Sequence, residues 1–368
     1  MQIDELLKLM VNEGASDLHL TVTSPPVFRI DGELMPQTDL PPMTAKDVEL
    51  ILEQIATQDQ RSVLDREWEL DCTYALPGLA RFRVSALRQR GVTSLAFRFV
   101  PFYVPSIDEW GLPQILKELI FKPKGLILVT GHSGSGKSTT LAAMLSHLND
   151  NATRSVITIE DPIEFVFRNK KCLIRQRSLG NDTKTFATAV IHALRHDADV
   201  IVIGEMRDLD TISAAITAAE TGHLVLGTLH TVDAPQSIDR IIDVFPYGQQ
   251  QQIRIQLSQV IEAVISQALL PRSDGGRIAA FEIMLASHTI KTKIREAKVF
   301  EIPVTIEVST PEGMQTLDQA LADLVKRKIV KLEDALTKSS SPAKLHRFLG
   351  SQAEVVTGQK VVGNIVKN

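Results

Sequence analysis

Cysteine is nearly absent from this chain, whose 368 residues contain only Cys72 and Cys172. Two isolated cysteines exclude a four-cysteine zinc site and are typical of a protein in the reducing cytoplasm. Long apolar runs are also absent, since no stretch approaches the ~20 residues that a membrane span requires. The N-terminal residues 1–5 are acidic, which is unlike a signal peptide.

A strong net charge is missing as well. The formal net charge is -4, so the chain has no overall attraction for nucleic acid, and a motor that tracks DNA or RNA would need a local basic groove. Internal repeats and low-complexity tracts are not seen. What remains, 44% hydrophobic and 23% charged residues, is ordinary for a protein with buried cores.

The chain is long enough for two domains, and we expect an α/β fold in both. Residues 101–113 are punctuated by prolines, which is typical of a linker. The expected regions are an N-terminal α/β domain at 1–100, a linker at 101–115, a second domain at 116–285, a helical region at 286–340 and a loosely ordered tail at 341–368.

Apolar spacing and alternation predict the elements of these regions. Before the linker they are a helix over 4–11, a strand over 16–22, a hairpin of 27–30 with 33–34, a helix over 46–55, and paired strands over 80–86 and 93–99. After it, strands and helices alternate as in a parallel sheet flanked by helices. Buried strands are expected over 156–159, 200–203 and 224–228, and helices from Thr289 to a break at 339–342.

A glycine-rich run lies between a strand-like segment at 126–129 and a helix-like segment at 140–145. Strand, G-x-x-x-x-G-K-[ST] and helix together predict a phosphate-binding loop for a nucleoside triphosphate. Its residues are Gly131, His132, Ser133, Gly134, Ser135, Gly136, Lys137, Ser138 and Thr139. Backbone N–H groups would cradle phosphates, Lys137 would reach the β- and γ-phosphates, and the Ser138 hydroxyl would coordinate Mg²⁺.

Carboxylates follow two of the predicted strands. Glu160, Asp161 and Glu164 come just past the strand at 156–159, where open α/β sheets place ligands. Mg²⁺ and an attacking water both need carboxylates nearby, although acids after a strand can also form a solvated turn. Glu205 ends the strand at 200–203 as in a Walker B segment, with Gly204 where aspartate is common. Glu205 would hold the metal through water or orient the nucleophile.

Two histidines, His223 and His230, bracket the predicted strand at 224–228. The spacing puts them at opposite ends of an extended strand, so a shared metal site is not expected. A single histidine at a strand end is often a structural residue. Two of them also suggest a pair that senses the γ-phosphate or couples neighbouring subunits.

These boxes, in this order, resemble those of the secretion ATPases of type IV pilus and type II secretion systems. The segments 14–20 and 313–318 resemble more narrowly the PilT-type retraction ATPases. The resemblance covers about residues 1 to 340. It implies a PAS-like N-terminal domain, a RecA-like ATPase domain that uses ATP and Mg²⁺, and a homohexamer at the cytoplasmic face of the inner membrane. There it would contact the pilus platform protein, and a paralogous pilus ATPase, without spanning the membrane or binding nucleic acid.

The same resemblance implies roles for individual residues. Glu164 would be the general base, Glu160 and Asp161 would support the metal, Glu205 would be the Walker B acid, and His223 with His230 would form the His box. Arginines of a neighbouring subunit's N-terminal domain would contact the nucleotide. The candidates are Arg81, Arg83 and Arg98, and the alternative for Arg81 and Arg83 is a solvated strand face. Arg195, Arg207 and Arg240 are less favoured.

The resemblance favours pilus retraction and twitching motility, because extension and type II secretion relatives carry a longer N-terminal region and typically a four-cysteine zinc insertion. Two departures stand out. His132 replaces the usual proline of the phosphate loop. Residues 289–296 align with the sequence Ala-Ile-Arg-Asn-Leu-Ile-Arg-Glu that is associated with retraction, and they keep only its residues at Ile290 and 294–296. The alternatives are an accessory or extension-type ATPase, a non-hydrolysing regulator, a nucleic-acid translocase and a small-molecule P-loop kinase.

Overall fold

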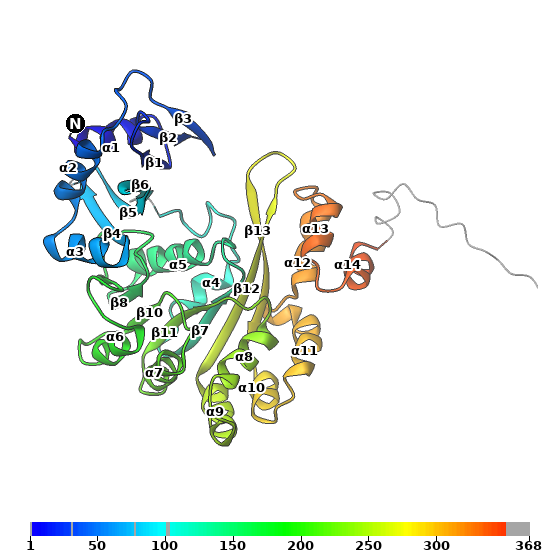
Figure 1. Ribbon diagram of the computed structural model, residues 1–368. Coiled ribbons are helices and arrows are strands. Elements are labelled where there is room, and N and C mark those ends of the chain that lie inside the picture. The colour runs from blue at the N-terminus through cyan, green and yellow to red at the C-terminus, as the bar shows by residue number, and fades with distance from the viewer. Residues whose placement is uncertain (1, 31, 77–78, 101–103, 351–368) are drawn as a thin grey trace, which may run out of the picture. The chain divides into compact units, whose positions relative to one another are not determined.

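The computed structural model describes residues 2–30, 32–76, 79–100 and 104–350. The chain divides into two compact units, one made of Met1–Val104 and Pro162–Phe167, the other of Pro105–Asp161 and Arg168–Asn368. Each unit contains one sheet with helices against it, which confirms the expected α/β class (Figure 1). Among the described residues, no helix has the length and apolar character needed to cross a bilayer.

The first unit is built on an antiparallel sheet of six strands in the order β3-β2-β1-β6-β5-β4. The strands are β1 (Asp17–Leu20), β2 (Val27–Ile30), β3 (Glu33–Pro36), β4 (Glu69–Leu76), β5 (Ala80–Gln89) and β6 (Val92–Val100). Three helices complete the unit: α1 (Ile3–Asn12), α2 (Ala45–Ile55) and α3 (Gln58–Glu67). Phe28, Phe82 and Phe97 are fully buried in its core, so one face of the sheet is apolar and covered.

The expected helices at 4–11 and 46–55, the hairpin, and the pairing of β5 with β6 are confirmed. Helix α3 was not expected, because Leu64 is its only buried residue and a single apolar position creates no periodic pattern. Its start is encoded instead by a capping box, in which the Thr57 hydroxyl accepts from the Gln60 N–H.

The second unit contains a seven-stranded sheet in the order β13-β12-β7-β11-β10-β8-β9. The strands are β7 (Gly125–Thr130), β8 (Ser155–Glu160), β9 (Leu173–Ser178), β10 (Val200–Ile203), β11 (Leu224–Leu229), β12 (Ile261–Pro271) and β13 (Arg277–Leu285). Strands β12, β7, β11, β10, β8 and β9 pair in parallel, which confirms the expected parallel sheet, although β9 and β12 were not among the expected strands. Only β13 runs antiparallel, as the second strand of a long hairpin with β12 that local patterns did not indicate.

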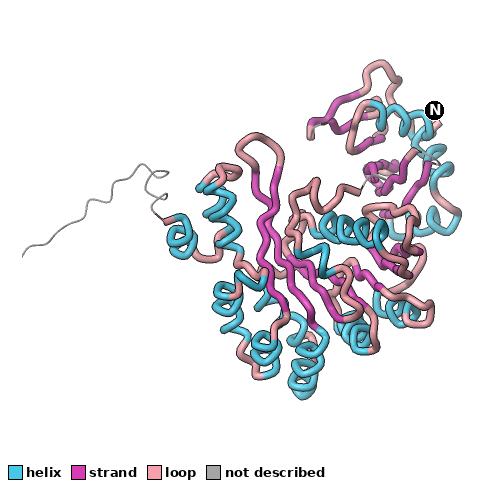
Figure 2. The backbone as a smooth tube through the Cα atoms, turned by 180° about the vertical axis from the view of Figure 1, so that it is seen from behind, coloured by secondary structure: helices cyan, strands magenta, loops and turns pink. Residues whose placement is uncertain are grey.

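Helices flank this sheet, as both views of the backbone show (Figures 1 and 2). Before β12 they are α4 (Ile115–Leu119), α5 (Lys137–Asn151), α6 (Phe186–Ala193), α7 (Leu209–Glu220), α8 (Ala234–Asp243) and α9 (Tyr247–Val260). After β13 come α10 (His288–Arg295), η1 (Val299–Glu301), α11 (Ile302–Val308), η2 (Thr310–Glu312), α12 (Leu317–Lys326), α13 (Leu332–Lys338) and α14 (Pro342–Leu349). The helical region expected after 289 is therefore present.

The expectation of a loosely ordered tail from residue 341 is wrong for its first part. Helix α14 packs on α12 and buries Leu345 and Leu349. The buried Asp318 carboxylate holds the break before this helix, because it accepts hydrogen bonds from the Ser339 and Ser340 hydroxyls and from two backbone N–H groups. The remainder, 351–368, lies outside the described residues.

Candidate active site

The phosphate loop connects β7 to α5 and depends on glycine at three positions. Gly131, Gly134 and Gly136 have φ angles of +143°, +76° and +92°, which L side chains rarely adopt. A Cβ on Gly131 would also lie 2.4 Å from the backbone oxygen of Gln267. The loop can therefore curl tightly against β12 only with glycine here.

Lys137, the first residue of α5, is 9% exposed and folds back over the loop. Its Nζ donates to the carbonyl oxygens of Gly131, at 2.9 Å, and His132, at 3.1 Å. Ser138 and Thr139 follow in the first turn of the helix, where free N–H groups and the helix dipole favour an anion. The ammonium and the helix N-terminus thus offer positive charge at one point, as phosphate binding requires.

Gln267 of β12 supports the loop, and the sequence motifs did not indicate it. Its side chain is 5% exposed; Nε2 donates to the Ser135 carbonyl at 2.6 Å, and Oε1 accepts from the Thr140 hydroxyl at 2.9 Å. One amide therefore ties the loop to the first turn of α5. The available signal was a polar residue inside the apolar strand 263–270, which must find partners when buried.

The residues of the loop fit a triphosphate. The buried Ser135 hydroxyl has no hydrogen-bond partner among the residues the structure describes, although a buried polar group normally has one. It belongs to the same loop whose glycines and Lys137 form the cradle. Phosphate oxygens are acceptors of the kind that such a hydroxyl and an ammonium bind.

Glu205 lies just beyond the carboxyl end of β10 and joins two other groups. Its carboxylate accepts from Arg207 Nε, and His230 Nε2 lies 3.0 Å from it at the end of β11. Burial raises the pKa of the Glu205 carboxyl, but the hydrogen bond from Arg207 and the charges of Arg207 and His230 outweigh it, so the pKa is lowered. An ionised, weakly basic carboxylate suits contact with a hydrated metal better than proton abstraction.

Gly204, in place of the common aspartate, has a steric reason. Its N–H donates to the Ile159 carbonyl of β8 at 2.7 Å, and a Cβ would lie 3.1 Å from that oxygen and 3.2 Å from Glu160 Cα. The ends of β8 and β10 therefore approach closely and bring Glu160 near this point. Glu160 Oε1 accepts from the Thr158 hydroxyl at 2.6 Å and from Gln176 Nε2 at 3.1 Å.

The two histidines occupy opposite ends of β11, as expected, and have different partners. His230 contacts Glu205, whereas His223 Nδ1 lies 3.0 Å from the Ala218 carbonyl at the end of α7. Within one subunit they are not a pair. His230 lies beside the Glu205 carboxylate, whereas His223 contacts the end of α7 next to its connection with β11.

Comparison with known proteins identifies the family. Residues 1–280 match the family model described as Type II/IV secretion system protein. The type IV pilus retraction ATPase PilT of Pseudomonas aeruginosa is 46% identical over 342 residues, covering 93% of this chain and 99% of that protein. This chain belongs to the type II/IV secretion system proteins, as a PilT-type pilus retraction ATPase.

Two further relatives agree. A crystal structure of the pilus retraction motor PilT with bound ADP aligns with a TM-score of 0.88 and 44% identity, over 94% of this chain and 99% of that one. The type IV pilus ATPase PilU of Pseudomonas aeruginosa is 38% identical over 359 residues, 96% of this chain and 93% of that protein. Nucleotide binding and ATP hydrolysis follow from membership of this family.

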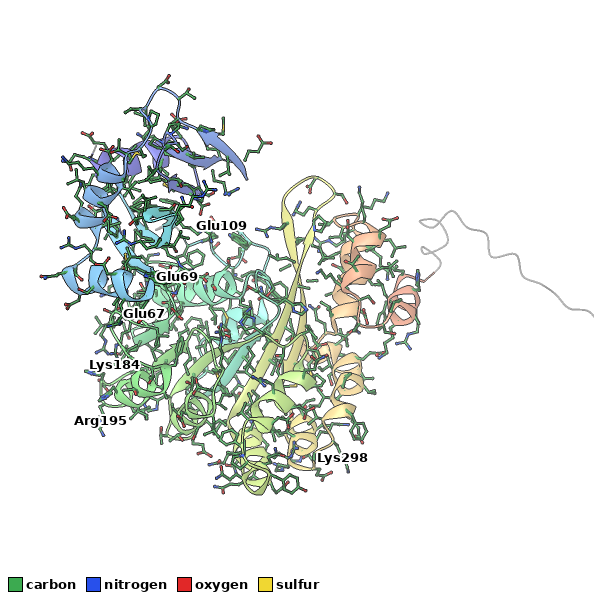
Figure 3. All side chains as sticks on the ribbon, viewed as in Figure 1. Glu67, Glu69, Glu109, Lys184, Arg195 and Lys298 are labelled. Atoms are coloured by element: carbon green, nitrogen blue, oxygen red, sulfur yellow. The ribbon has the colours of Figure 1, made fainter. Side chains whose placement is uncertain are left out.

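The other candidate residues of this PilT-type ATPase are distributed over both units. Glu164 lies in Pro162–Phe167, a segment of the first unit. Arg81, Arg83 and Arg98 lie on β5 and β6 of that unit. Of the less favoured arginines, Arg207 bonds Glu205, whereas Arg240 is exposed on α8. Arg195 is exposed just after α6 (Figure 3).

A magnesium ion fits this centre as a hydrated ion. Across the described ranges, no three His, Cys, Asp or Glu side chains gather into a preformed metal cage. The donors expected here are the Ser138 hydroxyl and the carboxylates of Glu160, Asp161 and Glu205. Mg²⁺ takes oxygen ligands and keeps several waters when it binds with a phosphate, so a complete protein cage is not needed.

Proposed function

We propose that this ATPase is a homohexameric, Mg²⁺-dependent motor that retracts type IV pili, and so drives twitching motility, from the cytoplasmic face of the inner membrane. The phosphate loop carries the proposal: it is closed around Lys137, while Glu205 and His230 meet beyond the ends of neighbouring strands. A relative named as a retraction ATPase, matched over nearly its whole length, supports the same function.

In the proposed reaction, the loop N–H groups and Lys137 bind the β- and γ-phosphates. Ser138 and the carboxylates of Glu160, Asp161 and Glu205 would hold a hydrated Mg²⁺. When bound, the ion neutralises charge that develops on the phosphate oxygens. Glu164 takes the proton of the attacking water.

His230 connects this chemistry to the sheet. Because it contacts Glu205, any shift of that carboxylate during the cycle reaches the end of β11. We assign the γ-phosphate sensor to this histidine, since His223 contacts α7 instead. The arginines of a neighbouring subunit complete the site, so that binding and release of nucleotide close and open the interface between subunits.

The partner moved by the ring is the pilus platform protein of the inner membrane, with a paralogous pilus ATPase as a second partner. An accessory pilus ATPase is the second candidate, and a match over nearly all of this chain to a relative named type IV pilus ATPase PilU is compatible with it. A nucleic-acid translocase is less favoured because the net charge is -4.

Steady-state phosphate release with purified full-length protein tests the enzyme. Glu164→Gln should abolish turnover and keep ATP binding, whereas Lys137→Ala should weaken both. Normal turnover of the first variant would remove Glu164 as the base. Added single- or double-stranded DNA should leave the rate unchanged; stimulation would point to a translocase.

Deletion in the host tests the biological role. Surface-crowded, non-retracting pili are expected, and loss of pili would support extension instead. Restoration of retraction by this chain in a host that lacks every other retraction ATPase would separate a motor from an accessory protein.

A further inference from the structure

A row of four charged side chains crosses the outer face of the N-terminal sheet. The strand register places Arg29 of β2 opposite Asp17 of β1, Asp17 opposite Arg98 of β6, and Arg98 opposite Arg83 of β5. Neighbouring strands lie about 4.8 Å apart, so the four residues span roughly 15 Å. Asp17 therefore lies between two guanidinium groups, those of Arg29 and Arg98, and a third, that of Arg83, lies beyond Arg98.

Alternation along the strands directs this row away from the core. The chain neighbours Leu18, Phe28, Phe97 and Val84 are all fully buried. Since successive side chains of a strand point to opposite faces, the charged row occupies the other face of the same sheet.

Asp17 is the anchor of the row. Its Oδ1 accepts from Arg98 Nε at 2.8 Å, its Oδ2 accepts from the Ser16 hydroxyl at 2.8 Å, and Arg29 Nε lies 3.9 Å from Oδ2. The Asp17 side chain is 8% exposed, whereas that of Arg98 is 68% exposed. Burial raises the pKa of Asp17, yet the hydrogen bonds from Arg98 and Ser16 more than offset this and lower it. The buried Asp17 carboxylate thus holds the Nε end of the exposed Arg98 guanidinium.

Arg83 is held differently. Within the described part of the chain its guanidinium has no hydrogen bond or ion pair, and it lies directly opposite Arg98. Like charges directly opposite on paired strands destabilise a sheet. Arg81 lies two residues before Arg83 on β5, on the same face of the sheet. It donates to the Thr73 hydroxyl at 3.0 Å and adds a further positive charge. This excess of guanidinium groups suits an anion with several oxygens, such as a phosphate.

We propose that Asp17 is a positioning residue, which orients Arg98 so that it binds, together with Arg83, the phosphates of a nucleotide held by a neighbouring subunit. The proposal rests on the proposed function, in which N-terminal arginines act on the adjacent site. It adds Arg29 to the arginines considered so far, as a second cation that Asp17 restrains. It also gives a purpose to Ser16 and Asp17 in the segment 14–20.

Kinetics of the full-length protein test this role. Arg83→Ala and Arg98→Ala should each lower kcat by about 100-fold or more, as expected for arginines that stabilise transition-state charge. Asp17→Asn should lower kcat about tenfold with the Kd for ADP unchanged, because the loop and Lys137 are untouched. The double variant Asp17→Asn/Arg98→Ala should be no slower than Arg98→Ala alone, because Asp17 acts only by orienting the Arg98 guanidinium, which is already absent in Arg98→Ala.

The matched control is Asp71→Asn, which removes another carboxylate of the same sheet, one that bonds the Ser85 hydroxyl outside the row. It should keep the wild-type kcat. Mixed rings give a second readout: Asp17→Asn subunits combined with Lys137→Ala subunits should hydrolyse ATP faster than either alone. In such rings an intact phosphate loop can face an intact arginine row.

The outcomes distinguish the positioning role of Asp17 from the action of the N-terminal arginines on a neighbouring subunit. Unchanged kcat in Asp17→Asn, or additive losses in the double variant, would overturn the positioning role while Arg98→Ala remained slow. If Arg83→Ala and Arg98→Ala also kept the wild-type kcat, the action of the arginines on a neighbouring site would itself be wrong.

Discussion

His230 Nε2 lies 3.0 Å from the Glu205 carboxylate, which links the ends of two neighbouring parallel strands. The residues are 25 positions apart, so this contact depends on the pairing of β10 with β11 and not on local sequence. His223, at the other end of β11, has no part in it. The two histidines of one box should therefore behave differently when they are replaced.

His230→Ala should lower kcat for ATP hydrolysis by about 10- to 100-fold with little change in the Kd for ADP, because it removes a partner of the Walker B carboxylate. His223→Ala should keep kcat and lower the unfolding free energy by about 1 kcal/mol, the value of one hydrogen bond. Phosphate release and thermal melting measure the two effects. Equal losses of kcat would instead support a functional pair.

Gln267→Glu should weaken nucleotide binding. The carboxylate would face the Ser135 carbonyl, which now accepts a hydrogen bond from Nε2, so the loop loses one of its supports. The Kd for ADP should rise about tenfold, measured by titration of a fluorescent ADP. The same change at the exposed Gln249 is the control, and an equal Kd in both variants would show that the loop does not need Gln267.

The phosphate loop was predictable from sequence because its glycines, Lys137 and the flanking strand and helix are contiguous. The positions of Glu205 and His230 at strand ends were predictable too, since each follows a buried apolar run. Gln267 was not, because it lies 132 residues from Ser135 and its importance arises from strand order. The same reason hides the opposition of Asp17 to Arg98, which are 81 residues apart.

Glu282 should make the stability of the protein depend on pH. Burial raises the pKa of this β13 carboxyl from 4.5 to about 7, although the Ala234 N–H donates to it. The pKa of Glu282 is higher in the folded than in the unfolded protein. The stabilisation that this carboxyl gives the folded state is therefore fully present below pH 4.5 and is lost as the pH rises through about 7. The free energy of unfolding should fall by up to about 3 kcal/mol over this change of pH.

Glu282→Gln keeps an oxygen for the Ala234 N–H and cannot ionise. The melting temperature of this variant, minus that of the wild type, should therefore increase between about pH 4.5 and pH 7, the interval set by the two pKa values. Glu333→Gln, at an exposed position of α13, should show no such trend. A constant difference for Glu282→Gln would mean that this carboxyl does not titrate in the interval.

Asp318 should hold α14 in place. The side chain is 1% exposed and accepts four hydrogen bonds from residues 339–341, immediately before the helix. Asp318→Ala leaves these donors without a buried acceptor, so the unfolding free energy should fall by about 2–4 kcal/mol and the amides of 342–349 should exchange faster with solvent.

Asp323→Ala, which removes an exposed carboxylate from the same helix, should leave both unchanged. Since Asp318 lies outside the phosphate loop and its carboxylates, the Kd for ADP should stay at the wild-type value. Hydrogen exchange with mass spectrometry measures the release of α14 directly, and unaltered exchange at 342–349 would show that the packing of Leu345 and Leu349 alone is sufficient.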